Sequence, residues 1–380
     1  MKPTLLLVGV GDLGGVLLEL LAREPRLGRI VAADRDAGRG TARCNLARAG
    51  AVAQGFEPDI RFEVIDLNDV AATAELIARA SPAVILGTAS LQTWWLPGTL
   101  PAPQAALIRK AGFGVWLPVN LTLTVKLMQA VREARYDGLT LTAPHPDVVN
   151  VVLARLGLAP TCGIGNLDEI VPKVRVLASE RLGAPIASVK VWLVAHHALE
   201  PPAFAGAAGE VAPYFLRIEH HGRDVTREVD GGELLFRPYP LPPGPAIHFL
   251  TGGSTLRLVN ALLFSDGTFL HAPAPHGLPG GYPVMAGRAG VGVKLPPGLT
   301  FEQAVDINTR SHRFDGIERI EEDGTVVFCQ ESVDTLRAVL DYSCDRLSPG
   351  DAGERAAELI TRFREFARRH GVDFAERFGR

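Results

Sequence analysis

The sequence contains few cysteines and no long apolar run. Its four cysteines, Cys44, Cys162, Cys329 and Cys344, lie far apart and form no CxxC pair. This spacing excludes a zinc knuckle and fits a reducing compartment. No stretch approaches the ~20 consecutive apolar residues of a membrane span. We therefore expect no membrane partner.

The chain also lacks a strong excess of charge. Its formal net charge is -3 and its isoelectric point is near 6.4, which disfavours binding to nucleic acid or anionic lipid. Basic residues between 362 and 380 alternate with acidic ones, a pattern typical of a solvated helix face. The N-terminus has no signal-peptide pattern, so a cytoplasmic location is expected.

Apolar residues are plentiful and distributed as in a globular protein. Of the 380 residues, 47% are hydrophobic and 21% are charged. A chain of this length exceeds what one hydrophobic core usually supports, so two domains sharing a cleft are expected. We expect a dinucleotide-binding Rossmann domain over residues 1–150 and a substrate-binding, catalytic α+β domain over residues 151–380, ending in a helix.

Short apolar runs alternate with helical patterns in the first domain. Strands are predicted at 5–8, 29–34, 60–67, 83–89 and 138–143, and most are separated by segments of helical periodicity. This order predicts an α/β fold with a doubly wound parallel sheet, whose ligands bind at the carboxyl ends of the strands. The Pro- and Gly-rich segment 94–103 is predicted to be a loop beside the cofactor. A mixed α and β second half follows, with an amphipathic helix from about residue 351.

The motif GVGDLG, residues 9–14, follows the first predicted strand and opens a helix. Gly9 permits a tight turn, Gly11 lets a pyrophosphate approach the backbone, and Gly14 allows close packing of helix and strand. An acidic residue, Asp34, comes twenty residues after Gly14 at the end of the next strand. This context favours a dinucleotide site over a simple tight turn, which stays the alternative. The expected cofactor contacts are Gly9, Val10, Gly11, Asp12, Leu13, Gly14, Asp34, Arg35, Thr88 and Ala89.

The acidic residue also bears on which dinucleotide binds. The Asp34 carboxylate is suited to accept hydrogen bonds from both ribose hydroxyls and would repel a 2′-phosphate, so NAD is the expected cofactor. Arg35 follows directly and offers a cation for such a phosphate, which leaves NADP open.

Several short motifs occur in an order that resembles the lactate and malate dehydrogenase superfamily. They are PHPDVVNVVLARLGL, GNLDEI, VKVWLVAHHAL, FSDGTFLHAP and GGYPVMAGRAGVGV. With GVGDLG, the resemblance covers most of residues 4–310. It implies an enzyme that transfers hydride between a nicotinamide and a hydroxyl/ketone pair of a small molecule. By analogy it also implies a homodimer or homotetramer.

The resemblance places the acid/base histidine of the family at His197 and the carboxylate that orients it at Asp168. A carbinol that loses hydride must also lose its hydroxyl proton, and imidazole is a natural acceptor near neutral pH. A carboxylate behind the ring fixes its tautomer. His196 is the alternative, although adjacent strand residues point to opposite faces, so only one of the two enters the cleft.

One family feature is missing. The arginine that clamps the substrate carboxylate is replaced by Val171, so the substrate is not expected to be simple lactate or malate. Either another cation substitutes or the substrate lacks that group. Arg109 and Arg257 are the candidate substitutes. His145 is expected near the position of the family asparagine that contacts the substrate carbonyl, and Asn120 near the nicotinamide.

Three alternatives stay open. An NAD- and metal-dependent glycosidase-like enzyme would use Cys162 and His197 on manganese, but Cys162 lies four residues before Asn166 instead of directly preceding it, and no metal site is expected. A saccharopine-dehydrogenase-like reductase is suggested by residues 64–86. A dinucleotide-binding regulatory protein without turnover is the non-enzymatic alternative, made credible by Val171.

Overall fold

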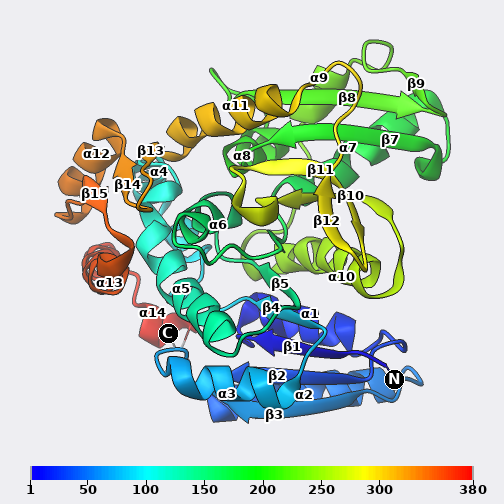
Figure 1. Ribbon diagram of the computed structural model, residues 1–380. Helices are drawn as coiled ribbons and strands as arrows, with labels where there is room; N and C mark the ends of the chain where they lie inside the picture. The colour runs from blue at the N-terminus through cyan, green and yellow to red at the C-terminus, as the bar shows by residue number, and fades with distance from the viewer. Residues whose placement is uncertain (1, 379–380) are drawn as a thin grey trace.

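The computed structural model describes residues 2–378, and its first half is built on a six-stranded parallel sheet (Figure 1). The strand order is β3-β2-β1-β4-β5-β6 with every pair parallel. The strands are β1 (Thr4–Val8), β2 (Arg29–Asp34), β3 (Asp59–Val64), β4 (Val84–Gly87), β5 (Leu139–Thr142) and β6 (Cys162–Gly163). This confirms the predicted Rossmann-type, doubly wound sheet.

The apolar character of β1 follows from helices on both faces of the sheet. Leu5 and Leu7 join one hydrophobic cluster and Leu6 joins another, because successive side chains of a strand point to opposite faces. All three are fully buried. A strand covered on both faces therefore reads as a continuous apolar run. The covering helices include α1 (Asp12–Leu21), α2 (Ala37–Val52), α3 (Val70–Ala80) and α5 (Leu117–Glu133).

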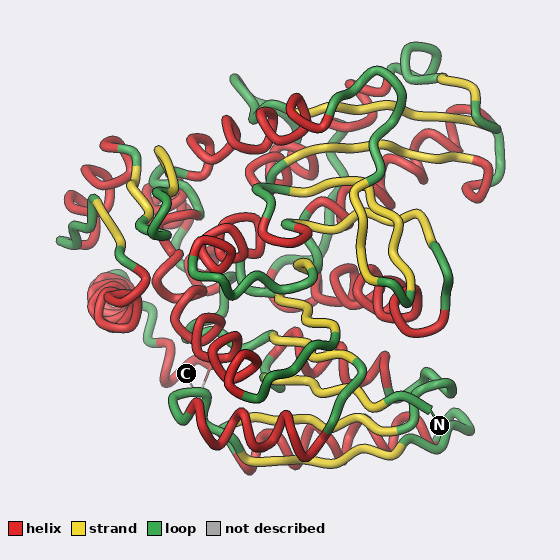
Figure 2. The backbone as a smooth tube through the Cα atoms, in the orientation of Figure 1, coloured by secondary structure: helices red, strands yellow, loops and turns green. Residues whose placement is uncertain are grey.

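A second, antiparallel sheet forms a separate layer, seen apart from the parallel strands in Figure 2. Its order is β10-β11-β7-β8-β9, with β12 paired to β11. Its strands are β7 (Val189–Ala195), β8 (Tyr214–His220), β9 (Arg223–Asp224), β10 (Thr268–Pro273), β11 (Gly281–Gly287) and β12 (Gly290–Val293). Its helices are α7 (Leu167–Leu182), α8 (Glu200–Ala205), α9 (Gly231–Phe236), α10 (His248–Phe264) and α11 (Phe301–Ser311). Helix α10 packs against α1 and so joins the two layers.

The C-terminal segment departs from the expected division at residue 150. Strand β6 extends the parallel sheet beyond that residue, and the last part of the chain returns to the first domain. It forms β13 (Ile317–Ile320), β14 (Val326–Phe328), β15 (Arg346–Leu347), α12 (Gln330–Leu340), α13 (Ala352–Arg369) and α14 (Phe374–Phe378). Helix α13 packs on α5, where the rings of Phe363 and Trp116 lie 5.1 Å apart. An amphipathic pattern predicts a helix but does not say which surface it covers.

The remaining elements are short. They are α4 (Ala102–Arg109), α6 (Pro146–Arg155), and the 3-10 turns η1 (Leu96–Thr99), η2 (Gly114–Trp116), η3 (Ile186–Ser188), η4 (His197–Leu199), η5 (Gly244–Ile247), η6 (Pro275–Gly277), η7 (His312–Asp315) and η8 (Pro349–Asp351). The segment predicted as a loop, 94–103, thus contains η1 and the start of α4. Among residues 2–378 no single helix has the length and apolarity to cross a membrane, while one bent pair, Ala102–Arg109 with Gly114–Glu133, passes that test by length and composition.

Candidate functional site

The glycine-rich turn joins β1 to α1, and its three glycines meet different surroundings. Gly9 has φ +94°, and a Cβ there would lie 2.7 Å from the backbone nitrogen of Ala89. A Cβ at Gly14 would lie 1.9 Å from the carbonyl oxygen of Gly9. At Gly11, no described residue other than its chain neighbours has an atom within 4 Å of such a Cβ. The turn therefore uses two glycines for its own packing and leaves open space at the third, as a dinucleotide phosphate group requires.

The end of β4 holds this turn in place. The Thr88 hydroxyl donates a hydrogen bond of 2.7 Å to the carbonyl oxygen of Gly9. The 94–103 segment also touches the turn, because the indole nitrogen of Trp95 donates to the Asp12 carboxylate at 3.0 Å. Thr88, Ala89 and the Pro-rich segment thus all lie at the glycine-rich turn.

The Asp34 carboxylate is tied to its surroundings at both oxygens. It accepts hydrogen bonds from the backbone nitrogens of Val10 (2.7 Å) and Asp36 (3.0 Å). It also accepts one from the guanidinium of Arg39 at 2.8 Å. The cation paired with Asp34 is therefore Arg39, which the sequence analysis did not single out, and Arg35 is exposed beside it. This pairing weakens the expected repulsion between Asp34 and a 2′-phosphate.

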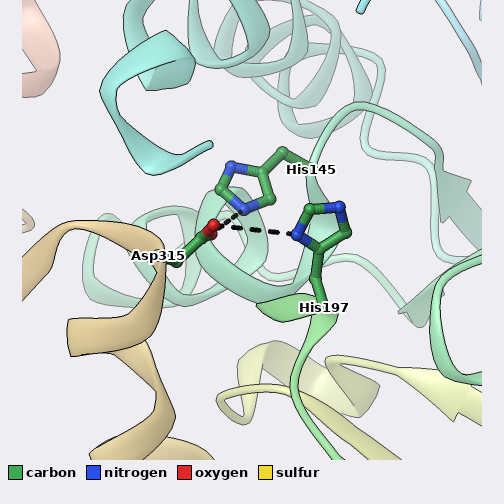
Figure 3. A group of neighbouring side chains, drawn as sticks. All are labelled: His145, His197 and Asp315. Carbon is green, nitrogen blue, oxygen red and sulfur yellow. Dashed lines mark hydrogen bonds and ion pairs between the residues drawn. The ribbon is translucent and has the colours of Figure 1, made fainter. Parts of the chain in front are cut away.

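Two histidines and an aspartate from distant parts of the chain meet near the carboxyl end of β5 (Figure 3). His145 immediately precedes α6, His197 begins η4 after β7, and Asp315 ends η7. The His145 Nε2 atom lies 2.8 Å from one carboxylate oxygen of Asp315, which is a hydrogen bond. The His197 Nδ1 atom lies 3.8 Å from the other oxygen, an ion-pair distance beyond hydrogen-bond range. We call these three side chains the His–His–Asp cluster.

The backbone around His145 holds the ring in place. His145 lies between two prolines and has φ +43°, the left-handed region that only a few per cent of non-glycine residues adopt. Phe113 packs on both rings of the cluster, with centroid distances of 4.9 Å to each. Its backbone nitrogen also donates to Asp315 at 3.2 Å. The cluster is therefore held by contacts with Phe113, and the left-handed backbone at His145 marks it as a functional candidate.

Two further carboxylates flank His197. The Asp147 side chain accepts a hydrogen bond of 2.5 Å from the backbone nitrogen of His197. A Glu200 oxygen lies 3.8 Å from His197 Nε2. Burial alone lowers the pKa of the His197 imidazole. The carboxylates of Asp315, Glu200 and Asp147 act in the opposite direction, with Asp315 having the largest effect, and the resulting pKa of His197 is about 9. Burial raises the pKa of Asp147 and of Glu200.

His196 points away from this cluster. Its side chain is 1% exposed, whereas that of His197 is 17% exposed. The His196 ring contacts that of His312 at 5.1 Å. Burial lowers the pKa of His196 well below its usual range and lowers that of His312 to about 4. Both rings are therefore neutral near pH 7, and His197 is the histidine that faces the candidate site.

The expected pairing of Asp168 with His197 has to be corrected. Asp168 interacts electrostatically with Arg257 and by hydrogen bonds with the backbone of His271 and the side chain of Ser254. The carboxylate beside His197 Nδ1 is Asp315 instead. Successive residues of a helix point about 100° apart, and Asp168 and Glu169 have different partners in α7. It is Glu169 that feels the charge of His197.

The burial of Asp168 predicts a pH-dependent stability. Burial raises the pKa of Asp168 to about 7, well above the value of about 3.9 of an aspartate in an unfolded chain. Because the folded-state pKa is the higher one, the stability present at low pH is lost as the pH rises toward 7. We expect the difference in free energy of unfolding, Asp168→Asn minus wild type, to increase by about 3 kcal/mol between pH 4.5 and pH 7.5. Urea unfolding of both proteins at the two pH values measures this difference. If the difference between the two proteins were the same at both pH values, Asp168 would not be buried as described.

The other expected site residues have the following surroundings. Arg109 is the exposed last residue of α4. Arg257 donates to the backbone oxygen of Phe269 at 3.0 Å. Asn120 is buried in α5, where its amide donates to the backbone oxygen of Trp116 at 3.2 Å. Val171 is buried in the core around α7. Neither candidate arginine is engaged with the His–His–Asp cluster, so neither takes the place of the missing clamp.

The cysteine considered as a metal ligand is also engaged elsewhere. Cys162 is fully buried in β6 within a hydrophobic cluster, and burial raises its pKa well above the usual range. This disfavours a thiolate ligand. A hollow of about 1000 Å³ lies at the opposite edge of the sheet and is lined in part by Lys2, Arg26 and Leu139. It is at the amino ends of the strands, where open α/β sheets do not bind their ligands.

No protein-family model matches the chain, and no curated protein matches it by sequence. Solved structures do match it. A malate dehydrogenase from Cryptosporidium parvum is 14% identical, with 83% of this chain and 97% of that chain covered and a TM-score of 0.59. A lactate dehydrogenase from the same organism, complexed with lactic acid and nicotinamide adenine dinucleotide, is 14% identical, with coverages of 83% and 98% and a TM-score of 0.58. A malate dehydrogenase from Plasmodium falciparum in complex with NADH is 13% identical, with coverages of 82% and 95% and a TM-score of 0.58. At such identities the comparison establishes the fold alone, and that fold is the one predicted.

Proposed function

We propose that this chain, which has the fold of the lactate and malate dehydrogenases, is a nicotinamide-dependent oxidoreductase that interconverts a hydroxyl group and a ketone. The observation that carries the proposal is the placement of the two sites. The glycine-rich turn follows β1, and His145 follows β5, at the same carboxyl edge of one parallel sheet. A dinucleotide on that turn runs along the edge where open α/β sheets bind ligands.

The residues around the turn fit a nicotinamide dinucleotide. The space at Gly11 and the amino end of α1 suit a pyrophosphate. Asp34 makes three hydrogen bonds, and a carboxylate has about four acceptor positions, so one stays for a ribose hydroxyl. NAD is therefore the preferred cofactor. Arg39 and Arg35 together keep NADP as the second candidate.

In the oxidation direction, the carbinol C–H bond breaks and its hydride, with both electrons, passes to the oxidised nicotinamide, which is the chemistry that the cofactor supplies. The hydroxyl proton passes to the neutral form of the His197 imidazole, and the C–O bond becomes a carbonyl. Because the pKa of His197 is about 9, oxidation is favoured at alkaline pH, and in the reverse direction the protonated ring returns the proton to the carbonyl oxygen. Asp315 and Glu200 lie on the two sides of that ring and stabilise its protonated form. Both the electron pair and the proton are thus accounted for.

The substrate proposed is not simple lactate or malate. Val171 stands where the resemblance expects the carboxylate-binding arginine, and it is buried in an apolar core. The groups that act most strongly on His197 are the carboxylates Asp315, Glu200 and Asp147. Such a surrounding repels a second, free carboxylate unless a cation accompanies it.

Absorbance of reduced nicotinamide provides the test. The purified chain is mixed with NAD⁺ or NADP⁺ and a panel of hydroxy acids, polyols, sugar acids and opines. Cofactor-coupled reduction with at least one compound is expected. Absence of any absorbance change, together with absence of NADH binding by fluorescence, would refute the proposal. Binding without turnover would favour the regulatory alternative. Light scattering on the same sample tests the dimer or tetramer that forms part of the proposal.

Replacing Gly11 by alanine is expected to weaken NADH binding by about 10-fold or more without lowering thermal stability. Among the described residues, apart from its chain neighbours, none has an atom within 4 Å of the added methyl group. The methyl group would therefore occupy space that is available to the pyrophosphate. Fluorescence titration measures the affinity, and thermal unfolding measures the stability.

Gly14→Ala is the matched control. Its methyl group would overlap the carbonyl oxygen of Gly9, so this variant is expected to lose about 1–3 kcal/mol of stability. If Gly11→Ala bound NADH as tightly as wild type, the turn would not be the phosphate site.

A further inference from the structure

We propose that the His–His–Asp cluster binds one divalent first-row transition-metal ion through His145, His197 and Asp315. The proposal deepens the oxidoreductase function and rests on it only for the use of the ion, since binding itself is independent of turnover. It reverses the expectation that the chain has no metal site. The three side chains come from positions 145, 197 and 315, which are too far apart in the sequence to form a metal-binding motif.

The geometry of the cluster is close to that of a metal site. Its three ligand atoms all lie within 4.8 Å of one another. Two ligand atoms bound about 2.1 Å from one ion are about 3 to 3.5 Å apart. The His145–Asp315 contact of 2.8 Å and the His197–Asp315 contact of 3.8 Å bracket that separation. Small rotations of the side chains are enough to place an ion between them.

The donor atoms and their supports also match. Two imidazoles and one carboxylate suit zinc, iron, cobalt or manganese in the divalent state. His197 Nδ1 is buried and has no hydrogen-bond partner, although it points at Asp315 as Figure 3 shows. Its other ring nitrogen faces Glu200 at 3.8 Å. A carboxylate behind the far nitrogen of a histidine is the usual outer support of a metal ligand.

The local charge favours a cation. Besides Asp315, the carboxylates of Asp147 and Glu200 act directly on His197. The groups that act most strongly on Asp147 in turn are His197, His145 and Asn166, none of which is a lysine or arginine. A divalent ion would compensate this excess of buried carboxylate.

The ion supplies the cation that Val171 does not. Three protein ligands leave at least one coordination position for an oxygen of the substrate, as in catalytic zinc sites. In the loaded protein His145, His197 and Asp315 would hold the ion, and the ion would supply a positive charge able to polarise a hydroxyl or carbonyl oxygen. The substrate class is then a hydroxyl or ketone compound bound through oxygen to the ion, with no requirement for a separate arginine.

Titration of the full chain with metal tests the proposal. After treatment with a chelator, Zn²⁺ binding is followed by calorimetry and Co²⁺ binding by its visible absorption. One ion per chain is expected. The Asp315→Asn and His145→Asn variants are each expected to bind at least about 100-fold more weakly. The matched control is Asp168→Asn, which removes a buried carboxylate outside the cluster, and circular dichroism checks that each variant is folded.

The adjacent His220 and His221, whose rings lie 4.4 Å apart, provide the control for adventitious binding. A double His220→Asn, His221→Asn variant should keep full affinity. Loss of binding in that variant, or equal weakening by Asp315→Asn and Asp168→Asn, would overturn the proposal, as would absence of binding in wild type. NADH binding and turnover are recorded on the same samples. Turnover without metal binding would refute only the proposed metal site. Metal binding without any nicotinamide binding would refute only the proposed oxidoreductase function.

Discussion

Replacing His197 by alanine is expected to lower kcat/KM by about 10³-fold while NADH affinity stays within about twofold of wild type. The variant removes the imidazole that receives the hydroxyl proton, and in the loaded protein it removes one ligand of the ion. The glycine-rich turn belongs to a different pair of elements, β1 and α1, so the cofactor should bind as before. Steady-state kinetics on the best substrate of the panel and fluorescence titration with NADH measure the two effects.

The control for this variant is His221→Ala, which removes an exposed histidine at the turn after β8. It is expected to keep wild-type kinetics. Unfolding of His197→Ala would make the comparison uninformative, so His197→Gln, which keeps a polar side chain of similar length, is measured in parallel. Wild-type turnover in a folded His197 variant would remove this residue from the chemistry.

The Asp315→Asn variant is expected to lower kcat/KM by about 10²-fold, whereas Asp168→Asn should change it by less than about threefold. Asp315 contacts both imidazoles of the cluster, and the isosteric amide removes its negative charge. It therefore loses both the stabilisation of protonated His197 and the charge that attracts an ion. Asp168 is directed toward Ser254 and His271 instead.

These two variants distinguish the structure from the family resemblance. The resemblance assigns the orienting carboxylate to Asp168, and the structure supports Asp315 in that place. A large loss with Asp168→Asn and a small loss with Asp315→Asn would restore the original pairing. Because each substitution keeps the size of the side chain, differences in packing contribute little to the comparison.

Features that depend on neighbours along the chain were predictable from the sequence. The apolar run of β1 indicates a strand that is buried on both faces, as the structure has it. The motif GVGDLG indicates a tight turn, in which Gly9 has a positive φ. The segment ending at Asp34 shows a strand, whereas the hydrogen bond from the turn to its last carboxylate is seen only in the structure. Each of these follows from local sterics or from the periodicity of a strand or helix. The different directions of His196 and His197 do not follow in this way, because β7 ends at Ala195 and His197 begins η4.

Tertiary packing decided the remainder. Arg39 reaches Asp34 only because the first turn of α2 lies beside the end of β2. Helix α13 covers α5 because its apolar face meets an apolar surface far away in the sequence. The amphipathic pattern predicts that one face of the helix is buried. It does not identify the surface against which that face packs.

The sequence by itself therefore specified the parallel sheet and the glycine-rich turn, since short-range geometry encodes both of them, while the family resemblance indicated His197 as a candidate. The sequence did not specify the partner of His197. Asp315 lies far along the chain in the short turn η7 before β13, a segment with no motif of its own. Its carboxylate reaches His145 and His197 because the C-terminal segment packs back against the first domain, beside Phe113. Contacts between distant segments depend on the complementarity of whole surfaces, and that is why only the folded chain reveals the His–His–Asp cluster.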